Sequence, residues 1–178
     1  MPAESTPAVY PLILETPRLI LRTVNRDDLQ QVVQTWDPNG THISQDQADR
    51  QVRWMLSNHG DLAAGKLTHL CLAVIHKDSG AWVGWCGLDN REDTGEGPAL
   101  FYVVRTPHRG RGFATEAARA VLAYALTEIN IPEMLARTKP DNPASRRVLD
   151  KLGMRYLGRN RAGDHSYALT QKEFLNIR

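Results

Sequence analysis

The stretch YVVRTPHRGRGFATE, residues 102–116, constrains the fold of this chain more than any other. It joins an apolar, strand-like run to the most regular helical pattern of the sequence through a loop that contains Gly110 and Gly112. A helix N-terminus has unpaired N–H groups and a partial positive charge, so it attracts anions. The glycines let the backbone approach an anion closely, and Arg109 and Arg111 provide cations for phosphate oxygens. The loop therefore predicts a pyrophosphate cradle.

Two nucleotide-binding fingerprints do not fit this loop. The dinucleotide-binding pattern needs a third small residue where Thr115 stands, and no acidic residue ends a following parallel strand. A P-loop needs Gly-Lys-Ser/Thr after four spacer residues, which is absent. The ligand of the cradle must be another phosphate compound.

The pattern around the loop alternates strands and helices. A helix begins at Ala114, since apolar residues recur with helical spacing at positions 114, 117, 118, 121, 122, 125 and 126. A second begins after Asn142, a typical N-cap followed by Pro143, and ends at Gly153. Earlier helices are expected from Arg26, capped by Asn25, and over 46–58, where His59-Gly60 is expected to end the helix.

Strands are expected in the remaining apolar runs. Residues 69–76 and 81–88 form a hairpin through the turn at 77–80. The other strand-like segments are 12–24, broken at Thr16-Pro17, and 99–104, 135–138, 155–157 and 166–169. Antiparallel runs around one strand–helix–strand crossover imply an α/β fold with a mixed (α+β) sheet.

The bulk properties describe an ordinary globular protein. The chain has 178 residues and a formal net charge of +2, which suits one domain over residues 11–178 behind a loose tail, 1–10. The balanced charge does not favour a nucleic-acid partner. Neither a signal peptide nor an apolar run of membrane-spanning length is found, so we expect no membrane partner and a cytoplasmic location. Cys71 and Cys86 lie in apolar runs and are expected to be buried thiols, although a disulfide stays open.

The sequence resembles the GNAT superfamily of N-acetyltransferases, and within it the RimJ/RimL-like branch. Residues 109–114, RGRGFA, match the superfamily's R/Q-x-x-G-x-G/A signature for acetyl-CoA, and FATEA continues as in that branch. DNPASRRVLDKLGM, 141–154, matches the second signature, and ETPRLILR, 15–22, matches the opening strand. The resemblance implies a central, mostly antiparallel mixed sheet of six to seven strands flanked by about four helices. The resemblance also implies that acetyl-CoA is the cosubstrate and that no metal is needed.

The resemblance also assigns residues to acetyl-CoA binding. The cradle would consist of Arg109, Gly110, Arg111, Gly112, Phe113, Ala114 and Thr115. The strand before it splays from its neighbour in this superfamily, so Tyr102, Val103 and Val104 would offer backbone groups to the pantetheine arm. One of their N–H groups would stabilise the charge that develops on the thioester oxygen. Asn142 matches a pantetheine contact, and Ser145 matches a position near the sulfur, where a hydroxyl could protonate the thiolate.

Acid and base are harder to assign. The tyrosine that serves as general acid in many relatives is replaced by Leu149, as is common in the RimJ/RimL-like branch. The usual carboxylate on the strand before the cradle corresponds to Ala99. Glu96 lies just upstream in an acidic loop with Asp89, Glu92 and Asp93, and is the candidate base. His108, Glu116 and His165 are further candidates, although packing or helix-dipole roles are commoner for such residues.

We therefore expect an N-acetyltransferase that moves the acetyl group of acetyl-CoA to a primary amine, on a protein N-terminus or a small molecule. No cysteine lies in a motif suited to an acetyl-enzyme, so direct attack in a ternary complex is expected. A non-catalytic acetyl-CoA-binding module is the alternative. The acceptor stays open, and so does the oligomeric state, although homodimers are common in the family.

Overall fold

The structure is a computed structural model that describes residues 12–35, 43–63, 68–90 and 97–177. The expected tail, 1–10, and the candidate base Glu96 lie outside these ranges. Among the described residues, no helix combines the length and the apolar character that crossing a membrane requires.

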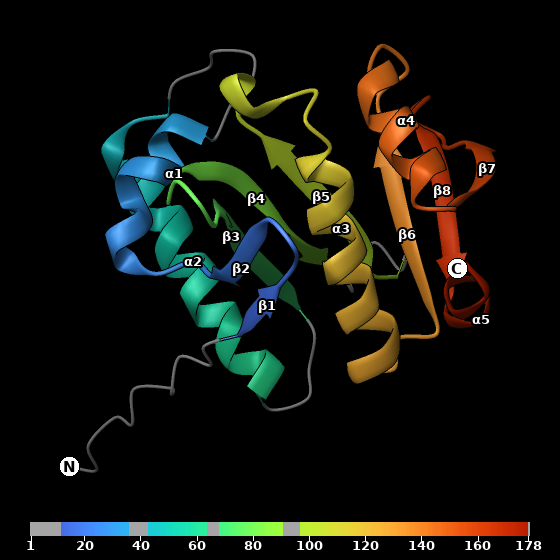
Figure 1. Ribbon diagram of the computed structural model, residues 1–178, viewed down its shortest axis with the longest axis horizontal. Coiled ribbons are helices and arrows are strands. Elements are labelled where there is room, and N and C mark those ends of the chain that lie inside the picture. The colour runs from blue at the N-terminus through green and yellow to red at the C-terminus, as the bar shows by residue number, and fades with distance from the viewer. Residues whose placement is uncertain (1–11, 36–42, 64–67, 91–96, 178) are drawn as a thin grey trace.

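A single mixed sheet runs through the molecule (Figure 1). Its strands are β1 (Ile13–Glu15), β2 (Leu19–Thr23), β3 (His69–His76), β4 (Trp82–Asp89), β5 (Ala99–Val104), β6 (Glu133–Thr138), β7 (Arg155–Arg159) and β8 (His165–Thr170). Their order is β1-β2-β3-β4-β5-β6-β8-β7, and every neighbouring pair is antiparallel except β5 and β6. The helices are α1 (Leu29–Thr35), α2 (Gln45–Ala63), α3 (Phe113–Ala123), α4 (Pro143–Lys151) and α5 (Gln171–Asn176). A π-helical turn, Tyr124–Glu128, extends α3.

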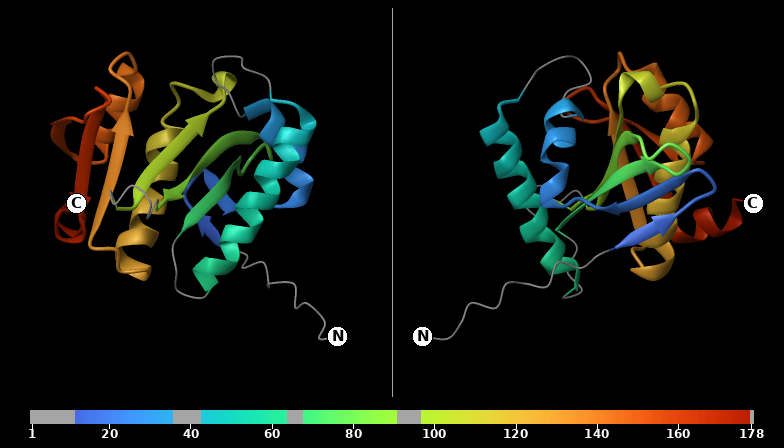
Figure 2. Two further views of the ribbon diagram at one scale, coloured as in Figure 1. Left: turned by 180° about the vertical axis from the view of Figure 1, so that it is seen from behind. Right: turned by 60° about the vertical axis from the view of Figure 1, so that its left-hand side comes forward.

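Helices cover both faces of the sheet, which Figure 2 shows from behind and from the side. Leu100 of β5 joins residues of α3 and α4 in the larger core cluster. Phe101 and Val103 of β5 pack on the opposite cluster, with Val32 of α1 and Val52 of α2. Successive residues of β5 therefore point to opposite faces of the sheet, as the two-residue period of a strand requires.

The expected mixed α/β fold is confirmed, with differences at its margins. The sheet has eight strands because the Thr16-Pro17 break makes two strands of the opening segment. The prediction that α2 ends at His59-Gly60 is wrong, since the helix continues to Ala63. Helix α5 was not predicted. Its signal was present, because Thr170 and Glu173 form a capping box in the structure.

One feature of the sheet positions the functional site. The parallel strands β5 and β6 pair only at Ala99 with Leu135 and at Leu100 with Ala136. Beyond Leu100 they diverge, as Figure 1 shows, with α3 following β5 and α4 following β6. The sheet is thus split at the carboxyl ends of these strands, and we call this opening the β5–β6 gap.

Candidate functional site

The predicted cradle lies between β5 and α3 and has the backbone that its glycines suggest. Gly110 and Gly112 have φ values of 74° and 81°, in the left-handed region that favours glycine. Gly112 is the N-cap of α3 and brings no side chain to the helix end. The first hydrogen bond inside the helix runs from Glu116 N–H to the Gly112 carbonyl oxygen, so the preceding N–H groups stand at the open helix start. This is the arrangement that suits a phosphate group.

The cradle is tied to the opening strands by Glu116. Its Oε1 accepts hydrogen bonds from Thr16 Oγ1 at 2.6 Å and from the Arg18 backbone N–H at 2.9 Å. Its Oε2 lies 2.7 Å from Arg18 Nε and 2.6 Å from Arg18 Nη2. Arg18 Nη1 in turn donates to the carbonyl oxygen of Arg111 at 3.0 Å. Glu116 therefore holds the cradle loop in place, which is a structural role.

The pKa of Glu116 reflects this environment. Partial burial alone would raise it, but hydrogen bonds from Thr16 and from both the backbone and side chain of Arg18 lower it below the ordinary value, together with the Arg18 charge. A carboxylate held in its ionised form by these donors is a poor proton acceptor. Glu116 is therefore an anchor for the loop. This agrees with the expectation that a structural role is commoner than catalysis for such a carboxylate.

The two arginines of the loop have different surroundings. Arg109 Nε donates to the carbonyl oxygen of Val104 at 2.9 Å, which closes the loop on the end of β5. The Arg111 guanidinium lies over the Phe113 ring, 4.9 Å from its centroid, and Arg18 lies 4.7 Å from the same ring. Phe113, the first residue of α3, is itself buried in the core. The exposed loop thus carries both arginine charges beside the open helix start.

The backbone of β5 faces the gap at alternate residues. Arg105 N–H donates to Val83 of β4, so by the alternation of a strand Val103 also directs its backbone toward β4. Tyr102 and Val104 then direct their N–H and carbonyl groups toward the β5–β6 gap, although the Val104 carbonyl already accepts from Arg109. Of the three predicted backbone positions, Tyr102 and Val104 are the ones that face the gap.

Two hydroxyl groups meet across the gap. Tyr102 Oη lies 2.8 Å from Ser145 Oγ and 3.2 Å from the Ser145 carbonyl oxygen, so the tyrosine of β5 contacts the first turn of α4. Asn142 caps that turn by accepting from Ser145 N–H at 3.0 Å. Burial raises the pKa of Tyr102 to about 12, although the hydrogen bond with Ser145 opposes the rise. The phenol therefore stays protonated at any physiological pH.

Other candidates for acid and base are placed less favourably. Leu149 is buried in the core and has no proton to give. His165, the first residue of β8, is buried, and its Nδ1 lies 3.0 Å from Tyr156 Oη on β7. Burial, together with the nearby charges of Arg111 and Arg105, lowers the pKa of His108. Glu96 cannot be assessed, because it lies outside the described residues.

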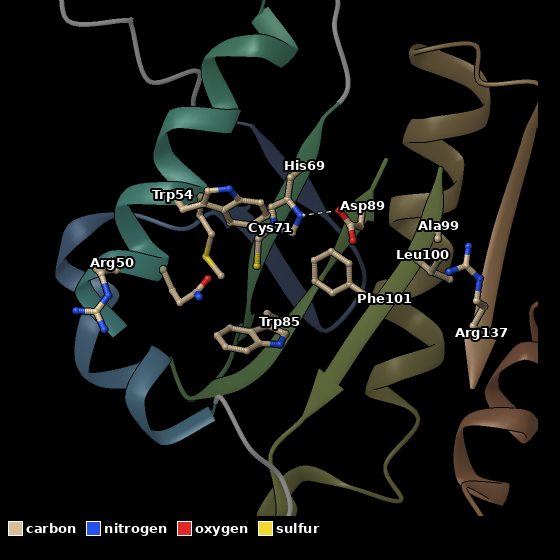
Figure 3. A pocket seen from close by; sticks show the side chains of 12 residues that line it. Arg50, Trp54, His69, Cys71, Trp85, Asp89, Ala99, Leu100, Phe101 and Arg137 are labelled. Atoms are coloured by element: carbon tan, nitrogen blue, oxygen red, sulfur yellow. Dashed lines mark ion pairs between the residues drawn. The ribbon is translucent and has the colours of Figure 1, made fainter. Parts of the chain in front are cut away.

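A cavity of about 820 Å³ opens on the other face of the sheet, between α2 and strands β3 to β6 (Figure 3). We call it the α2 pocket. It is lined by Arg50, Gln51, Trp54, Met55, His69, Cys71, Trp85, Asp89, Ala99, Leu100, Phe101 and Arg137. Its volume is within the usual range for small-molecule sites.

The α2 pocket contains an acid–imidazole pair that the sequence alone did not suggest. His69 Nδ1 lies 3.5 Å from Asp89 Oδ1, as the dashed line in Figure 3 marks. The two residues are cross-strand partners at one end of the β3–β4 hairpin, and Asp89 is in turn the partner of Ala99 on β5. The Asp89 carboxylate thus lies on the strand next to Ala99, the position where many relatives were expected to carry a carboxylate. The hairpin itself was predicted, but no local signal indicated the register that pairs these two residues.

Both cysteines are free and fully buried, as expected. Cys71 lines the α2 pocket, and Cys86 packs in the larger core cluster, on the α3 face of the sheet. Burial raises the pKa of both thiols, so neither forms a thiolate readily.

Comparisons with known proteins agree with this geometry. The family described as Acetyltransferase (GNAT) domain matches residues 18–155. The N-acetyltransferase p20 of Bacillus licheniformis, itself uncharacterised, is 28% identical over 150 residues, which cover 82% of this chain and 83% of p20.

Solved structures share the fold. A candidate ribosomal-protein-serine acetyltransferase from Vibrio cholerae superposes with a TM-score of 0.71 at 19% identity, covering 93% of this chain and 99% of its own. A mutant of the spermidine N-acetyltransferase SpeG from Vibrio cholerae superposes with a TM-score of 0.70 at 17% identity, covering 90% and 98%. With the family match spanning most of the sequence, the chain belongs to the GNAT acetyltransferases and is an acetyl-CoA-dependent acyltransferase.

Proposed function

We propose that this protein transfers the acetyl group of acetyl-CoA to a primary amine by direct attack, with both substrates bound at once. The observation that carries the proposal is the β5–β6 gap, which opens after Leu100 and leads to an uncapped helix start with glycines at 110 and 112. A ligand whose thin pantetheine arm leads away from a pyrophosphate matches that arrangement. The pyrophosphate would lie at the N-terminus of α3, between the charges of Arg109 and Arg111.

The gap supplies polar groups where the chemistry would take place. When bound, acetyl-CoA supplies an activated acyl group as a thioester. The N–H groups of Tyr102 and Val104 that face the gap are the candidates for stabilising negative charge on the acyl oxygen. Ser145 Oγ would donate a proton to the departing thiolate, and Tyr102 Oη, at 2.8 Å, would orient that hydroxyl. In this proposal, Ser145 and Tyr102 together take the role of the tyrosine general acid of many relatives, whose position is occupied here by the buried Leu149.

Direct transfer is supported by the cysteines. An acetyl-enzyme needs an accessible nucleophile, and Cys71 and Cys86 have no exposed surface. Burial also raises the pKa of both thiols. Incubation with acetyl-CoA alone, followed by mass spectrometry of the intact protein, should find no acetylated cysteine. A stable acetyl-cysteine would refute direct transfer.

For the acceptor we propose a primary amine on a small molecule or on a protein N-terminus, within the RimJ/RimL-like branch. The fold is shared with a candidate ribosomal-protein acetyltransferase and with a spermidine acetyltransferase, two proteins with very different acceptors. The fold by itself therefore does not select between these classes.

The first test is binding. A ligand at 100 times its Kd adds about 2.7 kcal/mol of stability, which raises the melting temperature by about 5–10 °C for a domain of this size. Excess acetyl-CoA should produce that rise in the wild type and not in Gly112→Glu. Gly163→Glu is the matched control, because Gly163 has a similar φ of 85° in a distant turn with open space around it. A rise that persists in Gly112→Glu would place acetyl-CoA elsewhere.

A further inference from the structure

Thr138 is the last residue of β6 and lies beyond the point where β6 separates from β5. Strand β6 pairs with β5 at Leu135 and Ala136 only, whereas it pairs with β8 along its whole length, from Glu133 to Thr138. The ladder to β8 therefore holds one side of Thr138, where its cross-strand partner is His165. The other side of Thr138 borders the β5–β6 gap.

The side chain of Thr138 lies on the face of the sheet that α3 and α4 cover. Met134 and Ala136 are buried in the larger core cluster with residues of these helices, and the two-residue period of a strand directs Thr138 to the same face. The parallel register matches Leu100 with Ala136, and its continuation by two residues sets Thr138 opposite Tyr102. Thr138 and Tyr102 therefore stand on opposite walls of the gap.

The hydroxyl of Thr138 is buried and unpaired. The residue is 6% exposed, and its Oγ1 has no hydrogen-bond partner among the residues that the structure describes. The imidazole of His165 is engaged elsewhere, since its Nδ1 lies 3.0 Å from Tyr156 Oη. The hydroxyls of Tyr102 and Ser145 lie 2.8 Å apart and pair with each other.

A buried, unpaired hydroxyl lowers the stability of a fold. Removing a hydroxyl from water costs free energy that a hydrogen bond normally offsets, and buried polar side chains in native proteins are for that reason nearly always paired. Valine has nearly the same shape as threonine and an equally good propensity for strands. Packing and strand propensity therefore do not explain the threonine, and a residue that breaks a local rule in this way is expected at a functional site.

The gap is the side of Thr138 from which a polar partner can come. Strand β8 occupies the opposite side, and the apolar core beneath α3 and α4 covers the face. The ligand proposed for the gap has a pantetheine arm, whose amide groups present carbonyl oxygens and N–H groups. A threonine hydroxyl can donate to the first and accept from the second. The missing partner and the proposed ligand are therefore chemically matched.

We propose that Thr138 is a binding residue for acetyl-CoA and that its Oγ1 forms a hydrogen bond with an amide group of the pantetheine arm. This inference rests on the proposed acetyl transfer. It adds a side-chain contact from β6 to a site whose other groups come from β5, α3 and α4. Because the bond forms only with the ligand, the hydroxyl strengthens binding and weakens the protein by itself.

Thr138→Val tests both effects in one variant. Without ligand, its melting temperature should be about 2–4 °C above that of the wild type, because an unpaired buried hydroxyl is removed. CoA should bind about tenfold more weakly by isothermal titration calorimetry, because an amide group of the arm would be left buried and unpaired. Unchanged affinity for CoA in Thr138→Val would overturn the inference.

Thr35→Val is the matched control. Thr35 is the last residue of α1, which packs on the opposite face of the sheet. Its Oγ1 is also buried and, within the described ranges, has no hydrogen-bond partner. Thr35→Val should therefore raise the melting temperature to a similar extent and leave the affinity for CoA unchanged. An equal loss of affinity in both variants would overturn the specific role of Thr138.

Thr138→Ser separates the hydroxyl from the packing of the side chain. It keeps the hydroxyl and removes a buried methyl group, so the melting temperature should fall while CoA binds as in the wild type. Thr138→Val should thus be the more stable and the weaker binder of the two variants. If Thr138→Ser loses as much affinity as Thr138→Val, the effect is one of packing and the inference is wrong.

The part of the ligand that Thr138 contacts is identified by truncation. ADP carries the pyrophosphate without the arm, so its affinity should be the same in wild type and Thr138→Val. CoA and acetyl-CoA should lose affinity equally, since both carry the arm. A loss confined to acetyl-CoA would assign the hydroxyl to the acyl oxygen, and a loss for ADP would mean that the cradle is disturbed. Either result would overturn the assignment to the arm.

The two proposals fail in distinguishable ways. Failure of wild-type protein to bind CoA or acetyl-CoA would refute the proposed function itself. Binding by the wild type that is unchanged in Thr138→Val would refute only the role of Thr138.

Discussion

The anchoring of the cradle by Glu116 leads to a quantitative prediction. In Glu116→Gln the shape is kept, but an amide N–H₂ or a neutral oxygen replaces the carboxylate opposite Arg18 Nε and Nη2, at 2.7 and 2.6 Å. Hydrogen bonds to charged groups contribute about 1.5–3 kcal/mol each. Because the Arg18 side chain is 46% exposed, solvent screens much of this, and we expect a loss of about 1–2 kcal/mol in the free energy of unfolding.

The assay is urea denaturation at pH 7, with the melting temperature as a second measure. A loss of this size lowers the melting temperature by about 2–8 °C. Asp49→Asn is the control, because Asp49 also lies 2.6 Å from an arginine, Arg53, but both side chains are well exposed, at 43% and 66%. An exposed pair on a helix contributes about 0.3–0.5 kcal/mol. Equal losses in the two variants would refute the anchoring role.

The pH dependence gives an independent check. The folded-state pKa of Glu116 is below the ordinary value of 4.5, so the stability that it contributes is present above pH 4.5 and is lost as the pH falls through the folded-state value. The difference between wild type and Glu116→Gln should therefore be full at pH 7 and pH 5 and should shrink below about pH 4. A difference that stays constant down to pH 3 would show that the charge is not the cause. Since Arg18 also holds the Arg111 carbonyl, acetyl-CoA affinity should fall as well, by up to about tenfold.

Three further predictions concern single side chains. Tyr102→Phe should lower kcat about tenfold, the value of one lost hydrogen bond, without changing the pH profile between 6 and 10, because the pKa of Tyr102 is about 12; an altered profile would contradict this. Leu149→Ala should cost about 2–5 kcal/mol of stability, since the side chain is buried in the core, and a loss under 1 kcal/mol in urea would argue against that packing. Cys71 and Cys86 should resist alkylation by iodoacetamide in native protein and react on unfolding, and rapid native labelling followed by mass spectrometry would refute their burial.

Local sequence determined much of the cradle. Gly110 and Gly112 stand where the backbone enters the left-handed region, and Asn142 and Pro143 stand where α4 begins. These are requirements of a few neighbouring residues, because caps, turns and helix starts depend on contacts within about four positions of the chain. The motifs for acetyl-CoA were therefore readable in order, and the mixed fold followed from the succession of strands and helices.

The pairing of His69 with Asp89 was decided by the tertiary structure. Closing the hairpin at residues 77–80 pairs Ile75 with Trp82, and an unbroken ladder would place His69 opposite Leu88. A bulge leaves Val83 as an extra residue, so Val74 pairs with Gly84 and every later partner moves by one position. His69 then faces Asp89, and their side chains share the α2 face. A shift of one residue turns a strand's side chains to the other face, so no reading of composition or periodicity reveals it.

The meeting of Tyr102 with Ser145 was also beyond the sequence, since the two residues lie 43 positions apart. Each was predicted to touch acetyl-CoA for a separate reason, one as backbone on a strand and the other as a hydroxyl on a helix. Their contact at 2.8 Å exists because β5 and β6 stop pairing after Leu100, which lets α4 approach the exposed edge of β5. Where strands separate depends on what packs between and behind them, here α3 and α4 in the larger core cluster, and such packing is a property of the whole chain.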